Sequence, residues 1–199
     1  MINQNFVILG AIIAAVGGLS YLIDTLKGKV KPNRVSYLLW SIAPLIAFFA
    51  EMKQGVGLPA LMTFIVGFLP FTVFIGSFVN KEAEWKLTHF DLTCGALSLV
   101  GLVLWYMTKS GNIAILFSLL ADGLAALPTV VKSFNYPETE SAWPYFTATI
   151  SAALTLLTIQ VWNFATYAFP VYILLVTLLI SSLVQFKLGK LLRSYVPFQ

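Results

Sequence analysis

The sequence predicts an all-α integral membrane protein with seven transmembrane helices. Of its 199 residues, 59% are hydrophobic and only 10% are charged, whereas a soluble domain carries roughly 25% charged residues. Its mean hydropathy is +0.87, and apolar runs of the length that a membrane helix needs fill nearly the whole chain. Because these runs are continuous and do not alternate with polar residues, they indicate helices and exclude the strands of a membrane barrel.

Short polar connections divide the chain into seven expected spans. In order, they cover residues 5–26, 34–51, 58–79, 90–107, 112–134, 142–161 and 167–186. The longest polar connection, 81–89, leaves no room for a soluble domain, so residues 1–199 are expected to form a single membrane domain. Trp85, Trp105, Trp143 and Trp162 flank the spans, where the aromatic belt of a membrane protein is found.

Lysine and arginine are distributed very unequally between the two ends of these spans. The first, third and fifth connections and the C-terminus hold Lys27, Lys29, Lys31, Arg34, Lys81, Lys86, Lys132, Lys187, Lys190 and Arg193. The other end has only Lys53 and Lys109. By the positive-inside rule the N-terminus is outside and the C-terminus cytoplasmic, and we expect a bacterial plasma membrane. Basic residues placed in this way orient a protein in a lipid bilayer and do not indicate nucleic-acid binding.

An internal repeat relates the two halves of the chain. A shift of 105 residues pairs Gly18 with Gly123, Lys27 with Lys132, Pro32 with Pro137, Ser36 with Ser141 and Trp40 with Tyr145. The same shift relates spans one, two and three to spans five, six and seven. It predicts two parallel three-helix repeats, about 5–79 and 112–186, joined by a linker helix at about 90–107, which is a 3+1+3 arrangement.

The second copy of the repeated turn carries the most specific motif. It reads Leu127-Pro-Thr-Val-Val-Lys132 and continues with Pro137-Glu-Thr-Glu-Ser141. This pattern resembles the SWEET and PQ-loop (MtN3-like) superfamily of 3+1+3 membrane transporters, in which a Pro-Gln helix end precedes a basic residue, a polar turn and a Ser-initiated helix. Thr129 replaces the glutamine here, and the first copy has Ile23 and Asp24 in place of both motif residues.

The resemblance implies a function as well as a fold. It implies a secondary transporter or facilitator that moves a small polar solute by alternating access, without a cofactor. A membrane receptor, or a sorting or sensor protein without net transport, stays open as the alternative, because one architecture supports several functions. A homo-oligomer is also left open.

Asp122 is the only carboxylate near the middle of an expected span. An aspartate there costs about 2.5–3.5 kcal/mol on insertion scales, so such residues face a cavity or a partner. One expectation is that Asp122 binds a proton or a cationic group of the substrate, and a bound proton could couple transport to the proton gradient. The alternative is that it is a protonated or hydrogen-bonded carboxyl, which holds helices together through nearby Ser or Thr. Candidate neighbours in a mid-depth cavity are Trp40, Ser41, Tyr145, Thr149 and Thr177. Alternatively, the aromatic residues anchor the starts of helices and the hydroxyl residues serve helix packing.

Prolines lie within or just inside several spans, where a proline removes a backbone hydrogen bond and kinks the helix. These are Pro44, Pro70, Pro128 and Pro144. Each is either a static kink or a hinge. The resemblance implies hinge or gating roles for Pro44, Pro128 and Pro144, which match helices that carry hinge prolines in the family.

No catalytic or metal site is expected. The chain has no phosphate-binding glycine loop, no paired catalytic carboxylates within a span and no nucleophile–base set, which disfavours an intramembrane enzyme. His89 and Asp91 indicate a solvated turn with a helix cap, because too few ligands converge for a metal. Glu51, Glu138 and Glu140 lie at span edges and are expected to be interfacial.

Overall fold

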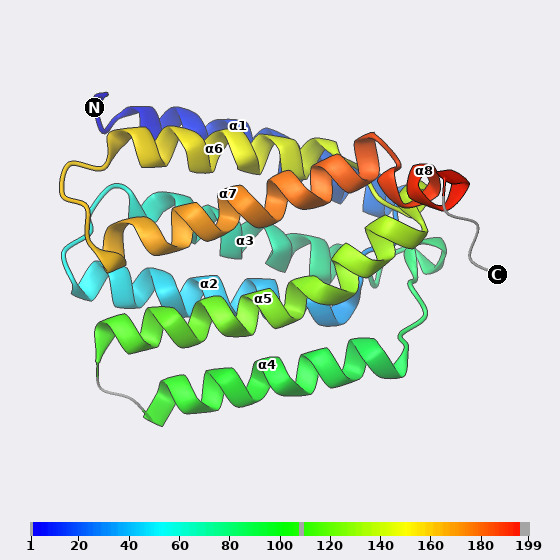
Figure 1. Cartoon of the computed structure of the whole chain (residues 1–199), viewed down its shortest axis with the longest axis horizontal. Coiled ribbons are helices and arrows are strands. Elements are labelled where there is room, and N and C mark those ends of the chain that lie inside the picture. The colour runs from blue at the N-terminus through cyan, green and yellow to red at the C-terminus, as the bar shows by residue number, and fades with distance from the viewer. Residues whose placement is uncertain (1, 108–109, 196–199) are drawn as a thin grey trace.

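The computed structural model describes residues 2–107 and 110–195. Within them the chain is helical and contains no strand. The elements are α1 (Phe6–Leu26), α2 (Arg34–Lys53), α3 (Ala60–Gly76), η1 (Lys81–Ala83), α4 (His89–Met107), α5 (Gly111–Asn135), η2 (Pro137–Thr139), α6 (Trp143–Thr158), α7 (Phe164–Gln185) and α8 (Leu188–Tyr195). Helices α1 to α7 lie roughly along the long axis of the molecule, and consecutive helices run in opposite directions (Figure 1).

Four of these helices, α1, α2, α5 and α7, are long and apolar enough to cross a membrane, and α3 and most of α4 form shorter apolar helices. The all-helical prediction is therefore confirmed, and the chain has several helices compatible with an integral membrane protein. Seven spans stay a prediction.

Helix α1 shows how side chains are distributed between the inside and the outside. Its large residues Ile12, Val16 and Ile23 are about half exposed, whereas Ala14 and Tyr21 are buried. Small residues on the inner face let neighbouring helices approach closely, and large apolar residues outside suit a lipid environment. A water-facing helix has the opposite pattern.

The helices pack in a pattern that is unchanged when the two halves are exchanged. Helix α3 contacts both α1 and α2, and α7 contacts both α5 and α6. Across the halves, α1 packs on α6 and α2 packs on α5. The pattern is preserved when α1 is exchanged with α5, α2 with α6 and α3 with α7. These are the helix pairs that the 105-residue shift relates in the sequence. Helix α4 lies outside it, against α5 and α2 (Figure 1).

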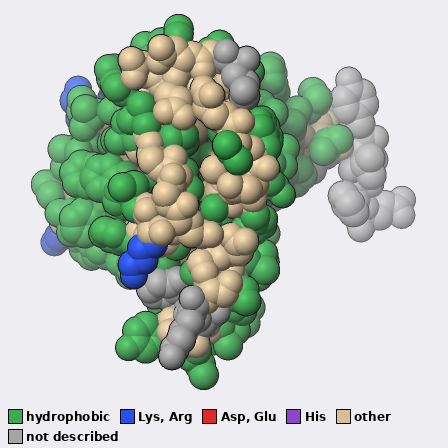
Figure 2. All heavy atoms as spheres, turned by 90° about the vertical axis from the view of Figure 1, so that its left-hand side faces the viewer, with side chains coloured by type: hydrophobic (Ala, Val, Ile, Leu, Met, Phe, Trp, Pro, Cys, Tyr) green, Lys and Arg blue, Asp and Glu red, His purple; other side chains and the backbone are tan. Residues whose placement is uncertain are grey.

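The connections with most lysines and arginines gather at one end of the molecule, together with α8 (Figure 1). Figure 2 looks onto the opposite end, where hydrophobic and uncharged polar atoms dominate and few Lys or Arg side chains are visible. We call the first of these ends the basic end. Which end faces the cytoplasm stays a prediction.

Helix α8 was not expected from the apolar runs, because it is short and carries alternating basic and apolar residues. It follows a turn at Lys187, whose φ is 49°. Lys190 of α8 pairs with Glu138 of η2 at 2.8 Å on the surface, and its hydrogen bond lowers the pKa of Glu138. This contact links α8 to η2 at the basic end.

The helix boundaries differ from expectation by three residues at the end of α3 and on both sides of the α6–α7 connection. Helix α6 ends at Thr158 and α7 begins at Phe164, each three residues earlier than the expected 161 and 167. A capping box explains the second shift: the Asn163 side chain accepts from the Thr166 N–H, and the Thr166 hydroxyl accepts from the Asn163 N–H. Such reciprocal bonds satisfy two otherwise unpaired donors at a helix start.

The prolines also differ from expectation in one respect. Pro44, Pro70 and Pro128 lie inside helices, as expected, but Pro144 lies in the first turn of α6. A first-turn proline loses no helical hydrogen bond, so the argument for a kink does not apply to Pro144. Pro170, inside α7, is a helix-interior proline that the sequence analysis missed.

Candidate functional site

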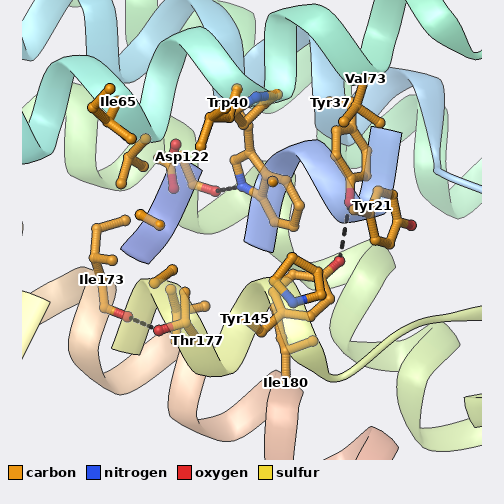
Figure 3. A pocket seen from close by; sticks show the side chains of 18 residues that line it. Tyr21, Tyr37, Trp40, Ile65, Val73, Asp122, Tyr145, Ile173, Thr177 and Ile180 are labelled. Atoms are coloured by element: carbon orange, nitrogen blue, oxygen red, sulfur yellow. Dashed lines mark hydrogen bonds between the residues drawn. The ribbon is translucent and has the colours of Figure 1, made fainter. Parts of the chain in front are cut away.

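A cavity of about 100 Å³ lies between the two halves of the molecule. All six helices of the two halves contribute to its lining, whereas α4 contributes no residue. It is bordered near the middle of the helices by Ile65 of α3, Asp122 of α5 and Ile173 of α7 (Figure 3). The cavity is therefore shared between the halves and does not belong to either one.

Four aromatic side chains form one side of this cavity: Tyr21, Tyr37, Trp40 and Tyr145. Tyr21 stacks on Tyr37 with ring centroids 5.5 Å apart, and Trp40 meets Tyr37 edge to face at 5.3 Å. Tyr145 contacts Trp40 edge to face at 6.5 Å. We call these four residues the aromatic cluster (Figure 3). Its members come from α1, α2 and α6, so it joins both halves.

Asp122 lies on the cavity wall beside Trp40 of the aromatic cluster (Figure 3) and is 1% exposed. Its Oδ2 atom accepts a 2.6 Å hydrogen bond from the Tyr172 hydroxyl, whereas Oδ1 is buried without a protein partner. Its backbone carbonyl accepts a 3.3 Å bond from Trp40 Nε1. Tyr172 of α7 therefore orients the carboxyl within one half, and Trp40 ties the same residue to the other half.

Some of the expected site residues border the cavity, and the others lie behind its wall or within the helix packing. Trp40, Asp122, Tyr145 and Thr177 border the cavity, as does Pro144. Thr149 lies behind the wall, where its hydroxyl meets that of Thr177 at 2.8 Å.

Ser41, Pro44 and Pro128 are buried in the helix packing and are not part of the cavity lining. The Ser41 hydroxyl donates to the Tyr37 carbonyl one turn earlier, which is a helix-packing role. Neither a Ser nor a Thr is the partner of Asp122; Tyr172 takes that position. The sequence did not indicate Tyr172 as the partner of Asp122, because the contact between them depends on the rotation of α7 against α5.

The basic end of the cavity is closed by a buried polar cluster that the sequence analysis did not find. Glu140 Oε2 accepts from the Tyr21 hydroxyl at 2.7 Å and from the Tyr145 hydroxyl at 3.3 Å. Its Oε1 pairs with Lys132 Nζ at 2.7 Å. Lys132 also donates to the Lys31 carbonyl of the α1–α2 connection and lies 4.7 Å from the Trp85 ring centroid.

Two expectations about these charges are wrong. Glu140 was expected to be interfacial, but its side chain is fully buried. Glu51 was expected to be interfacial too, but it is 1% exposed and accepts a 3.1 Å bond from Thr63. Burial of a charged group is acceptable when it is paired, and Glu140 has Lys132 and two tyrosine hydroxyls as partners. Glu51 has the Thr63 hydroxyl, while its Oε2 atom is buried without a hydrogen-bond partner among the described residues. For Asp91 the helix-cap expectation is confirmed, because its carboxylate accepts from the Thr88 N–H at 2.6 Å.

The other end of the cavity is closed by apolar packing. Met62, Ala152 and Phe169 are fully buried there and pack with Ala47 and Ile173. Beyond this layer lies a separate polar pocket formed by the α2–α3 and α6–α7 connections. The aromatic cluster with Glu140 thus faces the basic end, and an apolar plug faces the opposite one.

Comparisons of the chain with protein-family models, with curated proteins and with solved structures find no match. The resemblance to SWEET and PQ-loop proteins therefore stays a prediction from the sequence.

Proposed function

We propose that this protein is a SWEET-like secondary transporter or facilitator that moves a small polar solute through the membrane by alternating access. Helices α1 to α7 would be its seven spans in a 3+1+3 arrangement. The observation that carries the proposal is the cavity at the middle of the helices, lined by both halves and closed differently toward each end. Alternating access requires a site of this kind at the interface of two repeats.

The exchange symmetry of the packing supports the same mechanism. When two related three-helix units meet around a shared site, rocking one against the other opens the site to one side and then to the other. The basic end would open when Tyr21 and Tyr145 separate from Glu140. The opposite end would open when the layer around Met62 and Phe169 parts. Asp122 would bind either a coupling proton or a cationic group of the solute.

Thiol accessibility tests alternating access without knowledge of the solute. Cys94, the single cysteine, is replaced by serine, and a new cysteine is introduced by Ala14→Cys or Ala148→Cys on the cavity wall. A membrane-impermeant thiol reagent is then applied to each side of oriented vesicles. Ala126→Cys, at a buried position outside the lining, is the matched control.

We expect both cavity cysteines to react from both sides and the control cysteine to react from neither. Reaction from one side only, under every condition, would contradict alternating access. It would favour a receptor or sensor that binds a ligand without moving it.

A further inference from the structure

The cavity lining has a restricted chemistry that narrows the class of ligand. Among the described residues that line it, Asp122 is the only charged one, and none is Lys, Arg or His. A ligand carboxylate or phosphate buried here would have no cationic partner, and an unpaired buried charge is strongly unfavourable. Anions and zwitterions such as free amino acids therefore fit this lining poorly.

The hydroxyl groups of the lining are engaged with one another. The Tyr21 and Tyr145 hydroxyls face Glu140, and the Tyr37 hydroxyl lies 3.3 Å from that of Tyr145. The Thr177 hydroxyl donates to the Ile173 carbonyl. A sugar needs many free donors and acceptors around its hydroxyls, because each unsatisfied buried polar group costs free energy. The lining leaves few of them.

What the lining offers a ligand is aromatic surface and the carboxyl group of Asp122. Trp40 and the three tyrosines present their rings, and the aliphatic residues Ile65, Val73 and Ile173 complete the wall. Asp122 Oδ1 is buried and has no protein partner. Aromatic rings attract ammonium groups within about 6 Å of a ring centroid, and the attraction is stronger where water is excluded. A buried carboxylate that lacks a cationic partner is stabilised when an opposite charge binds beside it.

We propose that the cavity binds a small organic cation, an ammonium group with apolar substituents, with Asp122 as its counter-charge and the aromatic cluster around its apolar groups. This inference rests on the proposed function and specifies the class of solute. Tyr172 is a positioning residue, because it holds Oδ2 and leaves Oδ1 for the ligand. The volume of about 100 Å³, against roughly 300–1,000 Å³ for pockets that hold drug-sized molecules, restricts the ligand to few heavy atoms.

A pair of probes of the same shape tests the charge requirement. Choline carries a quaternary ammonium, and 3,3-dimethylbutan-1-ol has the same shape with carbon in place of the charged nitrogen. Binding of each to the purified full chain in lipid nanodiscs is measured by calorimetry, with glucose and alanine as competitors. We expect choline to bind at least tenfold more tightly than the alcohol, and neither competitor to displace it. Equal affinities, or displacement by glucose or alanine, would overturn the inference.

Two variants assign the binding to this cavity. Asp122→Asn keeps the shape of the side chain and removes its charge, and we expect it to lower choline affinity at least tenfold. Glu51→Gln changes another buried carboxylate that does not border the cavity, and we expect unchanged affinity. Ala148→Leu fills part of the cavity while leaving Asp122 in place, and should weaken binding of both probes. Unchanged choline binding in Asp122→Asn, when that variant elutes as the parent does, would overturn the assignment.

The inference and the proposed function fail in different ways. Choline that binds but does not enter proteoliposomes faster than it enters protein-free ones would contradict transport and leave the ligand class standing. Cavity cysteines that react from both sides in a protein that does not bind choline would support alternating access and contradict the ligand class.

Discussion

Lys132 and Glu140 form an ion pair of 2.7 Å whose side chains are almost completely buried, at 1% and 0% exposure. Lys132 lies in the last turn of helix α5, and Glu140 lies just before α6. The same two residues reach across to the other half, Lys132 through the Lys31 carbonyl and Glu140 through Tyr21. Lys27, which the repeat pairs with Lys132, is exposed. The two halves therefore share a helix–turn–helix, but only the second has this buried pair.

Removing one partner of this pair leaves the other charge buried without compensation. We expect Lys132→Met and Glu140→Gln each to lower the free energy of unfolding by about 3–5 kcal/mol. The double variant removes both charges and should be much less destabilised than the sum of the singles. Denaturant titration of the protein in micelles measures all three.

The surface pair of Lys190 and Glu138, with both side chains more than half exposed, is the matched control. We expect Lys190→Met to change stability by less than about 1 kcal/mol. Strictly additive losses in the Lys132 and Glu140 double variant would show that the two groups do not interact as described.

The Tyr21 hydroxyl should help to hold the basic end closed. Tyr21→Phe removes the 2.7 Å bond to Glu140 while keeping the ring. A hydrogen bond to a charged group contributes about 1.5–3 kcal/mol, which corresponds to roughly a tenfold to hundredfold shift toward the open state. In the Ala14→Cys background we expect faster thiol labelling from the basic end.

Tyr37→Phe is the control for this experiment, because the 3.3 Å contact of the Tyr37 hydroxyl is with the neutral Tyr145 hydroxyl and not with Glu140. It should change the labelling rate much less. If the two phenylalanine variants behaved alike, the bond from Tyr21 to Glu140 would not be a gate.

Gly17 lies at a close approach of α1 to α6. A Cβ atom at this position would overlap the Thr147 hydroxyl and lie 3.1 Å from the Cα atom of Pro144. We expect Gly17→Ala to destabilise the protein by about 1–3 kcal/mol through overpacking. Thr147→Ala in the same chain should recover part of the loss. Thermal unfolding in detergent provides the measurement.

Gly123 is the comparison for Gly17, because it also lies inside a helix but has more space. A Cβ atom at Gly123 would meet the Tyr172 side chain at 3.8 Å, an ordinary contact distance. Gly123→Ala should be tolerated. Equal destabilisation at both glycines would point to a general effect of alanine and not to the α1–α6 contact.

Pro128 tests whether a helix-interior proline acts as a hinge. It lies inside α5, where it leaves the Leu124 carbonyl without its usual partner. If Pro128 is a hinge, Pro128→Ala should stiffen α5 and slow labelling of the cavity cysteines from at least one side. Pro144→Ala, in a first turn where no bond is missing, should affect labelling less. Unchanged labelling in Pro128→Ala would identify a static kink.

The sequence by itself determined the all-helical class, the approximate helices and their apolar composition, and it predicted the correspondence of the two halves and the singular position of Asp122. Each of these depends on local composition or on the high cost of polar groups among apolar residues, which is visible along one chain. The same reasoning led to Trp40, Tyr145 and Thr177, which do border the cavity.

Only the tertiary structure decided which side chains meet. Tyr172 as the partner of Asp122, the burial of Glu140 against Lys132 and Tyr21, and the exclusion of Ser41 from the cavity depend on how each helix is rotated and shifted against its neighbours. Those quantities are set by packing among several helices at once, where a small rotation moves a side chain from the cavity to a helix interface. Apolar spans leave this rotation undetermined, because most of their residues suit lipid and protein interior equally well.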